Sequence, residues 1–96
     1  MVAMNCTTIR PGRRYLSYHD AVAVASRAME GAGAGTVLLD LQDTVETTTA
    51  TLARLIVLRQ ELRRSGRDLL IAGLTGRAES LYQICRISRA LPRSGT

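Results

Sequence analysis

The sequence contains no lysine, no phenylalanine and no tryptophan, and it has only two cysteines and one histidine in 96 residues. Two cysteines, Cys6 and Cys85, are too few for the disulfide framework of a small secreted domain. Together with His19 they also fall short of the four ligands of a structural zinc site. We therefore predict a reduced protein with no metal site and no cofactor.

Long apolar runs are missing as well. The apolar runs that are present are short. For example, LIVL at residues 55–58 is far shorter than the roughly 20 residues that a membrane-spanning helix needs. The first residues lack the apolar core of a secretory signal peptide. These absences predict a cytoplasmic protein that does not contact a membrane.

All 13 basic residues are arginine, and against 8 acidic residues they give a net charge of +5. Because the arginines are spread along the chain, we interpret most of them as solvated surface. An Arg-driven nucleic-acid-binding module is the alternative, and it would need Arg59, Arg63 and Arg67 on one ridge. Stacking platforms for bases are scarce, since the only aromatic residues are Tyr15, Tyr18 and Tyr82.

Hydrophobic patterning predicts alternating strands and helices, and therefore a single small α/β domain with a mostly parallel sheet of four to five strands and about three helices. We expect the core to span residues 14–92, with loose ends at residues 1–4 and 93–96. The expected strands cover residues 5–9, 13–17, 36–41 and 68–73, and the expected helices cover residues 20–30, 50–64 and 75–91. The run at residues 36–41 is almost continuously apolar, which predicts a strand covered on both faces.

Two of the expected helices have apolar faces that we assign to the core. Val22, Ala25 and Met29 share a face of the first helix. The corresponding face of the last helix carries Leu81, Ile84, Cys85, Ser88 and Leu91. Cys85 on this face is predicted to be a buried hydrophobe and not a reactive thiolate.

No catalytic constellation stands out, so we predict that the chain is not an enzyme. His19 has Ser17 and Asp20 as sequence neighbours, but such neighbours rarely converge as a triad, and an exposed histidine is expected. Gly31, Gly33 and Gly35 follow a helix instead of opening one, so they do not match a phosphate-binding loop. Residues 73–76 have the right context for such a loop but lack its lysine and its length.

Acidic and hydroxyl side chains gather after the strand at residues 36–41. Asp40, Asp43 and Glu46 are expected to form a solvated loop, with a Mg²⁺ site as the alternative. The threonine-rich run at residues 47–51 follows them at the start of the longest helix. Threonine there normally caps backbone N–H groups, but a phosphate on such a hydroxyl would also be tolerated and could make or break a protein contact.

Residues 37–92 resemble the STAS domain of bacterial anti-sigma factor antagonists. The resemblance rests on VLLDL at residues 37–41, the hydroxyl-rich helix start, the helix ending in RSGR at 64–67, the strand LLIAG at 69–73 and RISRALP at 86–92. In that family the helix start carries an Asp-Ser-Ser-Gly-like motif, and the last helix ends near a glycine where this sequence has Arg86.

The resemblance implies a non-enzymatic module that binds an anti-sigma factor, a serine/threonine kinase or another STAS protein. Aligned without gaps from Asp40, the motif falls on residues 48–51, and the phosphorylated serine corresponds to Ala50, which cannot accept phosphate. A shift of one residue places Thr49 there, so Thr49 and then Thr48 are the phosphorylation candidates. The implied partner contacts are Asp43, Glu46, Thr47, Thr51 and Arg54. A STAS scaffold that forms oligomers without phosphorylation is the alternative.

Overall fold

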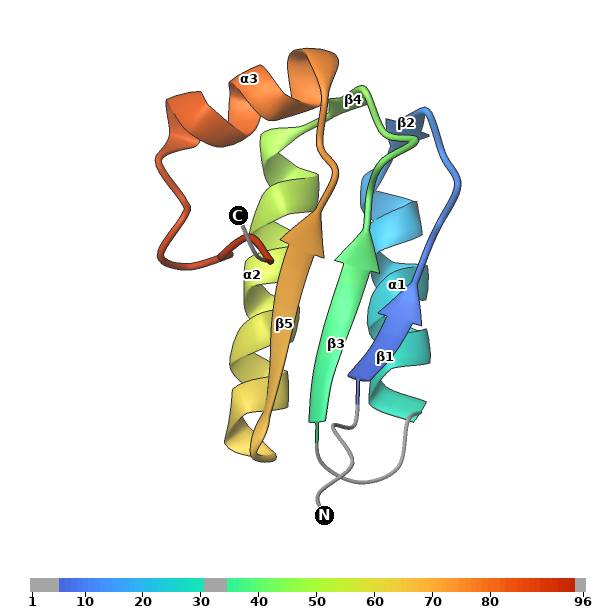
Figure 1. Cartoon of the computed structure of the whole chain (residues 1–96), viewed down its shortest axis with the longest axis vertical. Coiled ribbons are helices and arrows are strands. Elements are labelled where there is room, and N and C mark those ends of the chain that lie inside the picture. Colours follow the sequence, from blue (N-terminus) through green and yellow to red (C-terminus); the bar gives the residue numbers. More distant parts are fainter. Residues whose placement is uncertain (1–5, 31–34, 95–96) are drawn as a thin grey trace.

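A computed structural model of the chain describes residues 6–30 and 35–94. The described residues form five strands and three helices (Figure 1). Their order is β1 (Cys6–Ile9), β2 (Tyr15–Leu16), α1 (Tyr18–Glu30), β3 (Gly35–Asp40), β4 (Glu46–Thr47), α2 (Thr49–Arg64), β5 (Arg67–Ala72) and α3 (Gly76–Cys85). The predicted α/β class with parallel pairing and three helices is confirmed.

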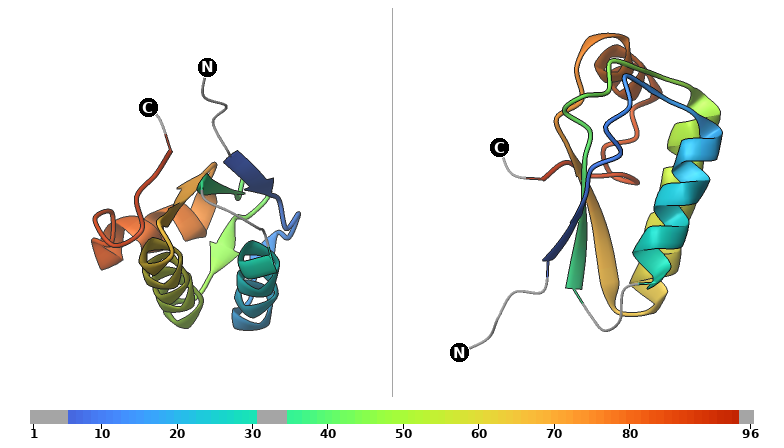
Figure 2. Two further views of the ribbon diagram at one scale, coloured as in Figure 1. Left: turned by 90° about the horizontal axis from the view of Figure 1, so that it is seen from below. Right: turned by 90° about the vertical axis from the view of Figure 1, so that its right-hand side faces the viewer.

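The strands form two parallel sheets. The larger one has the order β1-β3-β5, and the smaller one pairs β2 with β4. Helices α1 and α2 both cover the same face of the larger sheet, while α3 lies at the end where its strands finish (Figure 2). The connections that follow β1, β3 and β5 therefore meet at this carboxyl edge, which is the edge where α/β folds place their binding sites.

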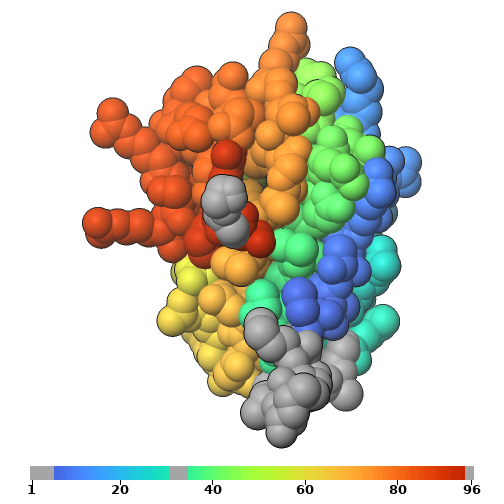
Figure 3. All heavy atoms as spheres, in the orientation of Figure 1, coloured from blue at the N-terminus to red at the C-terminus, as the bar shows by residue number. Residues whose placement is uncertain are grey.

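None of the helices in the described part of the chain lies over the other face of the larger sheet (Figure 2). In β3 the side chains of Val37 and Leu39 are buried, whereas Leu38 between them is half-buried, and β5 repeats this alternation with Leu70. Strands β1, β3 and β5 all reach the surface on this face (Figure 3). The prediction that residues 36–41 are covered on both faces is therefore wrong, because α3 packs at the end of the sheet and not on its second face.

Helix α1 begins with a reciprocal cap. The Ser17 hydroxyl accepts from the Asp20 N–H at 3.0 Å, and the Asp20 carboxylate accepts from the Ser17 N–H at 3.0 Å. Its buried residues are Ala21, Val24, Ala25 and Ala28. Of the predicted inner face only Ala25 is buried. The side of α1 that packs against the sheet is formed mostly by small alanines, which let the helix come close. Val22 and Met29 lie outside that side and are exposed.

Helix α3 ends at Cys85, earlier than the predicted Leu91. Arg86 follows it in the left-handed conformation with φ 53°, which stops the helix. Ile84 and Ser88 are exposed and Cys85 is only partly buried, so the predicted inner face is wrong at these three positions. The buried residues of α3 are Ala78 and Tyr82 instead.

The segment after α3 returns to the edge of β5 that is not paired with β3. The Ile71 N–H donates to the Pro92 carbonyl at 3.1 Å, and the Ser94 N–H donates to the Ile71 carbonyl at 2.8 Å. The Arg93 guanidinium lies 4.7 Å from the centre of the Tyr82 ring. Residues 93 and 94, expected in a loose end, are thus held against the sheet, while residues 1–4, 95 and 96 lie outside the described part, as do Gly31 and Gly33.

Candidate functional site

The site lies at the carboxyl edge of the strands, where the loop at residues 41–45 leads from β3 to β4 and α2. Thr44 is buried in this loop, and its hydroxyl donates to the Arg13 carbonyl at 2.8 Å. On the other side, the Ala78 N–H of α3 donates to the Val45 carbonyl at 2.8 Å. The loop is therefore fixed between the segment before β2 and the start of α3.

Two glycines allow this close packing. Gly73 has φ +87°, and a Cβ atom placed there would lie 2.8 Å from both Cα and N of Gln42. Gly76 has φ +60°, and a Cβ there would lie 3.1 Å from the Val45 carbonyl oxygen. The segment at residues 73–76, which the sequence suggested only as a weak phosphate loop, thus serves to hold the neighbouring loop in place.

The two predicted acidic contact residues are exposed, and each pairs with an arginine. Asp43 accepts from Arg10 at 2.9 and 3.2 Å, through both carboxylate oxygens. This hydrogen bonding, with the positive charge of Arg10, holds the pKa of Asp43 below its ordinary value. Glu46 lies 3.4 Å from the Arg77 guanidinium at the start of α3. The exposed rim of the site therefore alternates in charge and is not purely acidic.

The four threonines of residues 47–51 have different roles. The Thr47 hydroxyl donates to the Leu16 carbonyl at 2.8 Å, which joins the two strands of the smaller sheet. Thr48 is the N-cap of α2 and accepts from the Thr51 N–H at 3.2 Å. Thr51 is fully buried, with its hydroxyl 2.9 Å from that of Thr48. Only Thr49, the first residue of α2, is exposed.

This arrangement changes the list of contact residues. Thr51 was expected to touch a partner, but its burial means that its hydroxyl supports the cap instead. Arg54 is half-buried on α2 and lies 3.8 Å from Glu61. Asp43, Glu46 and Thr49 remain exposed at the carboxyl edge, and Thr49 is the accessible hydroxyl at the helix start.

An open hollow of about 490 Å³ lies beside Glu46. It is lined by Arg14, Val45, Glu46, Gly76 and Arg77. No sequence pattern indicates it, because Arg14, Glu46 and Arg77 are far apart along the chain. The parallel pairing of β2 with β4 brings Arg14 near Glu46, and the packing of α3 on β4 brings Arg77 to the same place. Arg10, Arg14 and Arg77 are thus site residues that pattern analysis missed.

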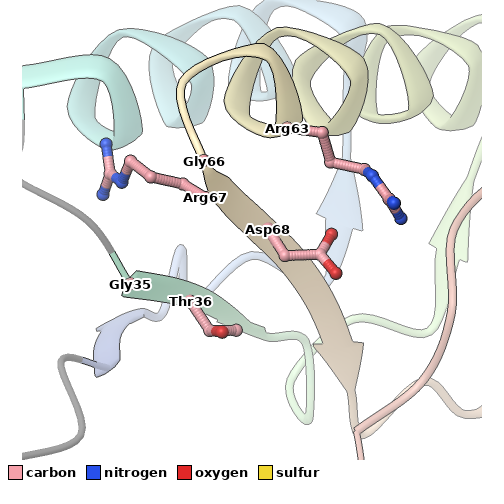
Figure 4. A pocket seen from close by; sticks show the side chains of 6 residues that line it. All are labelled: Gly35, Thr36, Arg63, Gly66, Arg67 and Asp68. Atoms are coloured by element: carbon pink, nitrogen blue, oxygen red, sulfur yellow. The ribbon is translucent and has the colours of Figure 1, made fainter.

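A second hollow, of about 330 Å³, lies at the opposite edge of the sheet (Figure 4). It is lined by Gly35, Thr36, Arg63, Gly66, Arg67 and Asp68. Arg67 and Arg63 extend to opposite sides (Figure 4), and Arg67 donates to the Ala28 carbonyl at 2.9 Å. Because these arginines do not converge, the hollow does not form an anion site.

Asp68 is held by Arg59, whose Nε donates to it at 2.8 Å. Burial raises the pKa of Asp68, but the hydrogen bonds from Arg59 and the Leu69 N–H outweigh this effect, and the pKa is lowered. Arg59 also donates to the Arg89 carbonyl at 3.1 Å. The ridge of Arg59, Arg63 and Arg67 that nucleic-acid binding would need is therefore not free, since two of its three members bind inside the fold.

Within residues 6–30 and 35–94, no three side chains of His, Cys, Asp or Glu are arranged to hold a metal ion. Asp40 accepts instead from the Gln42 N–H and side-chain amide, each at 3.1 Å. His19 is exposed. None of the described helices is both long and apolar enough to cross a membrane.

Comparison of the sequence with models of known protein families gave no match, and comparison with curated proteins gave none either.

Proposed function

We propose that the chain is a non-enzymatic bacterial regulator of the anti-sigma factor antagonist type, acting in the cytoplasm. Its partner would be an anti-sigma factor, a serine/threonine kinase or another STAS protein. The contact surface would be the carboxyl edge at Asp43, Glu46 and Thr49. Support comes from the sequence resemblance over residues 37–92, whose segments occupy β3, the two ends of α2, β5 and the stretch that follows α3 in one small α/β fold.

The exposure of Thr49 carries the proposal. Thr48 and Thr51 use their hydroxyls in the cap, whereas the Thr49 side chain projects from the first turn of α2. A phosphate there would sit next to the positive end of the helix dipole, so it would be tolerated by the fold. It would add about 1.5 to 2 negative charges to a surface on which Asp43 and Glu46 are already paired with Arg10 and Arg77. Such a modification would weaken or redirect a docked partner.

The test is affinity capture of the chain from cells that naturally produce it, with nuclease treatment, followed by mass spectrometry of the partners and of the chain. We expect a kinase-like anti-sigma factor or STAS proteins, and phosphate on Thr49. With the captured partner purified, Thr49→Glu should weaken binding at least about tenfold, which corresponds to about 1.4 kcal/mol. Thr49→Ala should bind like the unmodified protein.

Ser65→Glu is the matched charge control, because Ser65 is exposed at the opposite end of α2. Equal weakening by both glutamates would show a general charge effect and would refute the contact surface. Unchanged affinity of Thr49→Glu for a verified partner would refute the switch.

A constitutive scaffold is the second candidate. Ala50, which occupies the phosphorylated position in the ungapped alignment, favours it. This candidate predicts the same partners with a chain that is never modified. Recovery of nuclease-sensitive partners alone would instead favour the Arg-driven nucleic-acid alternative.

A further inference from the structure

Helices α1 and α2 carry apolar side chains that the fold leaves exposed. Tyr18, Val22 and Met29 of α1 are 51%, 41% and 47% exposed, and Val57 of α2 is 43% exposed. These are four of the six large apolar residues that are exposed in the described part of the chain. Clustering of this kind on one layer indicates a contact surface more than scattered single residues do.

Tyr18, Val22 and Met29 lie on the side of α1 that faces α2. The opposite side of α1 carries Asp20, Ala23 and Arg27, and these line a hollow with Pro11 and Arg13 beyond the outer edge of the helix pair. Tyr18, Val22 and Met29 are separated by four and seven residues, so they share one line on the helix surface. This line therefore borders α2, which packs beside α1 (Figure 2).

On α2, the exposed Val57 and the half-buried Arg54 and Glu61 lie on the side toward α1. Arg59, on the other side of α2, bonds to Asp68 of β5 and to the Arg89 carbonyl, away from α1. Arg54, Val57 and Glu61 follow spacings of three and four residues, which is the spacing of a helix–helix seam. We define the helix-layer patch as Tyr18, Val22 and Met29 together with Arg54, Val57 and Glu61.

The charges of this patch are complementary to the same patch on a second copy. When two α2 helices lie antiparallel with Val57 near the centre, Arg54 of each lies opposite Glu61 of the other. A twofold axis repeats each such contact, which is the geometry of most homodimers. The apolar residues of α1 then border the seam from both sides.

The Arg54–Glu61 pair within one chain is loose enough to be exchanged. Its atoms are 3.8 Å apart, and the buried Nη1 of Arg54 makes no hydrogen bond within residues 6–30 and 35–94. Because that nitrogen is buried, the Arg54 side chain must turn outward to meet Glu61 of a second copy, and the 3.8 Å pair is the ion pair lost when it does. We propose that the helix-layer patch is a homodimer interface, in which two copies pack α2 against α2 antiparallel around Val57.

This interface is separate from the carboxyl edge proposed above to bind a regulatory partner, so either proposal can fail without the other. The test is the solution mass by analytical ultracentrifugation across a wide range of protein concentration. We expect twice the 10.4 kDa mass of one chain. A monomer at every concentration overturns the proposal.

Charge exchange at the seam gives the sharper test. Arg54→Glu sets two carboxylates opposite each other across the seam, and Glu61→Arg sets two guanidinium groups opposite each other. Each variant alone should therefore self-associate at least about tenfold more weakly than the parent chain. Mixed together, the two variants are complementary and should form a heterodimer, which also shows that both are folded. The double variant Arg54→Glu, Glu61→Arg should dimerise like the parent chain.

Arg63→Glu is the control, because Arg63 is exposed on α2 and lines the hollow with Asp68, away from the seam, and it should leave the dimer unchanged. Failure of the two folded single variants to associate when mixed would overturn the proposed antiparallel seam. Loss of the dimer in Arg63→Glu to the same extent as in Arg54→Glu would overturn it as well.

Discussion

Replacing Gly73 with alanine should destabilise the protein strongly, because Gly73 holds the candidate site against the fold. An alanine at φ +87° costs about 1–2 kcal/mol in backbone strain. Its Cβ would also lie 2.8 Å from two backbone atoms of Gln42, which cannot rotate away as a side chain does. Overpacking of this kind adds about 1–3 kcal/mol. We expect a total loss of about 2–5 kcal/mol, or a fall in Tm of roughly 10–30 °C for a domain of this size.

Gly66 supplies the matched control for this measurement. It has a similar φ of +78°, but nothing lies within 4 Å of a Cβ placed there. Gly66→Ala should therefore show the backbone strain alone, about 1–2 kcal/mol. Urea unfolding of both variants isolates the contact with Gln42 as the difference between them. Equal losses would refute the reasoning that Gly73 is required by the approach of the loop at residues 41–45.

Three further predictions concern the helix ends and the ion pair of Asp68. Thr48→Ala should cost about 1 kcal/mol in urea unfolding because it removes the cap of α2, while Thr49→Ala should change stability by less than about 0.5 kcal/mol; equal effects would contradict the different roles of the two residues. Arg86→Gly should raise stability by about 0.5–1 kcal/mol because glycine adopts the left-handed backbone of Arg86 freely, and a lower Tm would contradict this. Because the pKa of Asp68 is lowered in the fold, its stabilising pair with Arg59 is present above about pH 4 and is lost as the pH falls below that value. Asp68→Asn should therefore be less stable than the parent chain at pH 7, by about 1 kcal/mol or less. On acidification it should lose less stability than the parent chain does, and thermal unfolding at several pH values measures this. Equal acid sensitivity of the two proteins would contradict the pairing.

The central part of the fold could be predicted from local sequence signals. Residues 36–41 and 68–73 are short apolar runs that come after Gly35 and Gly66, and they became β3 and β5 with shifts of one residue. The predicted helix at residues 50–64 differs from α2 by one residue, because apolar periodicity, a threonine cap and Gly66 all agree there. Agreement among independent local signals explains this accuracy.

Other features depend on contacts that no local pattern records. The inner face of α1 is set by how closely its alanines approach the sheet, so the larger Val22 and Met29 were wrongly assigned to the core. The pair of Arg10 with Asp43 joins residues 33 positions apart, and it exists because β1 and β3 are parallel and end at the same edge. Helix α3 stops at Arg86 through a left-handed backbone at a residue that is not glycine, which propensity does not anticipate.

At the candidate site, the sequence identified the segment but not the roles within it. Four threonines in five residues all had the chemistry of a cap or of a phosphate acceptor. The bonds of Thr47 to Leu16 and of Thr48 to Thr51 separate them, and they leave Thr49 as the exposed hydroxyl. Such a distinction needs burial, which depends on the elements packed around the helix start.

The most direct test of the proposed function is site-specific photo-crosslinking from the start of α2. A photoreactive residue would replace Thr49 in one variant and Ser65, at the other end of α2, in a second, and each would be irradiated in cells that produce the chain. We expect a covalent product with a regulatory protein partner from position 49 and none with that partner from position 65. A partner that co-purifies with both variants but crosslinks only from position 65 would contradict the proposed contact surface.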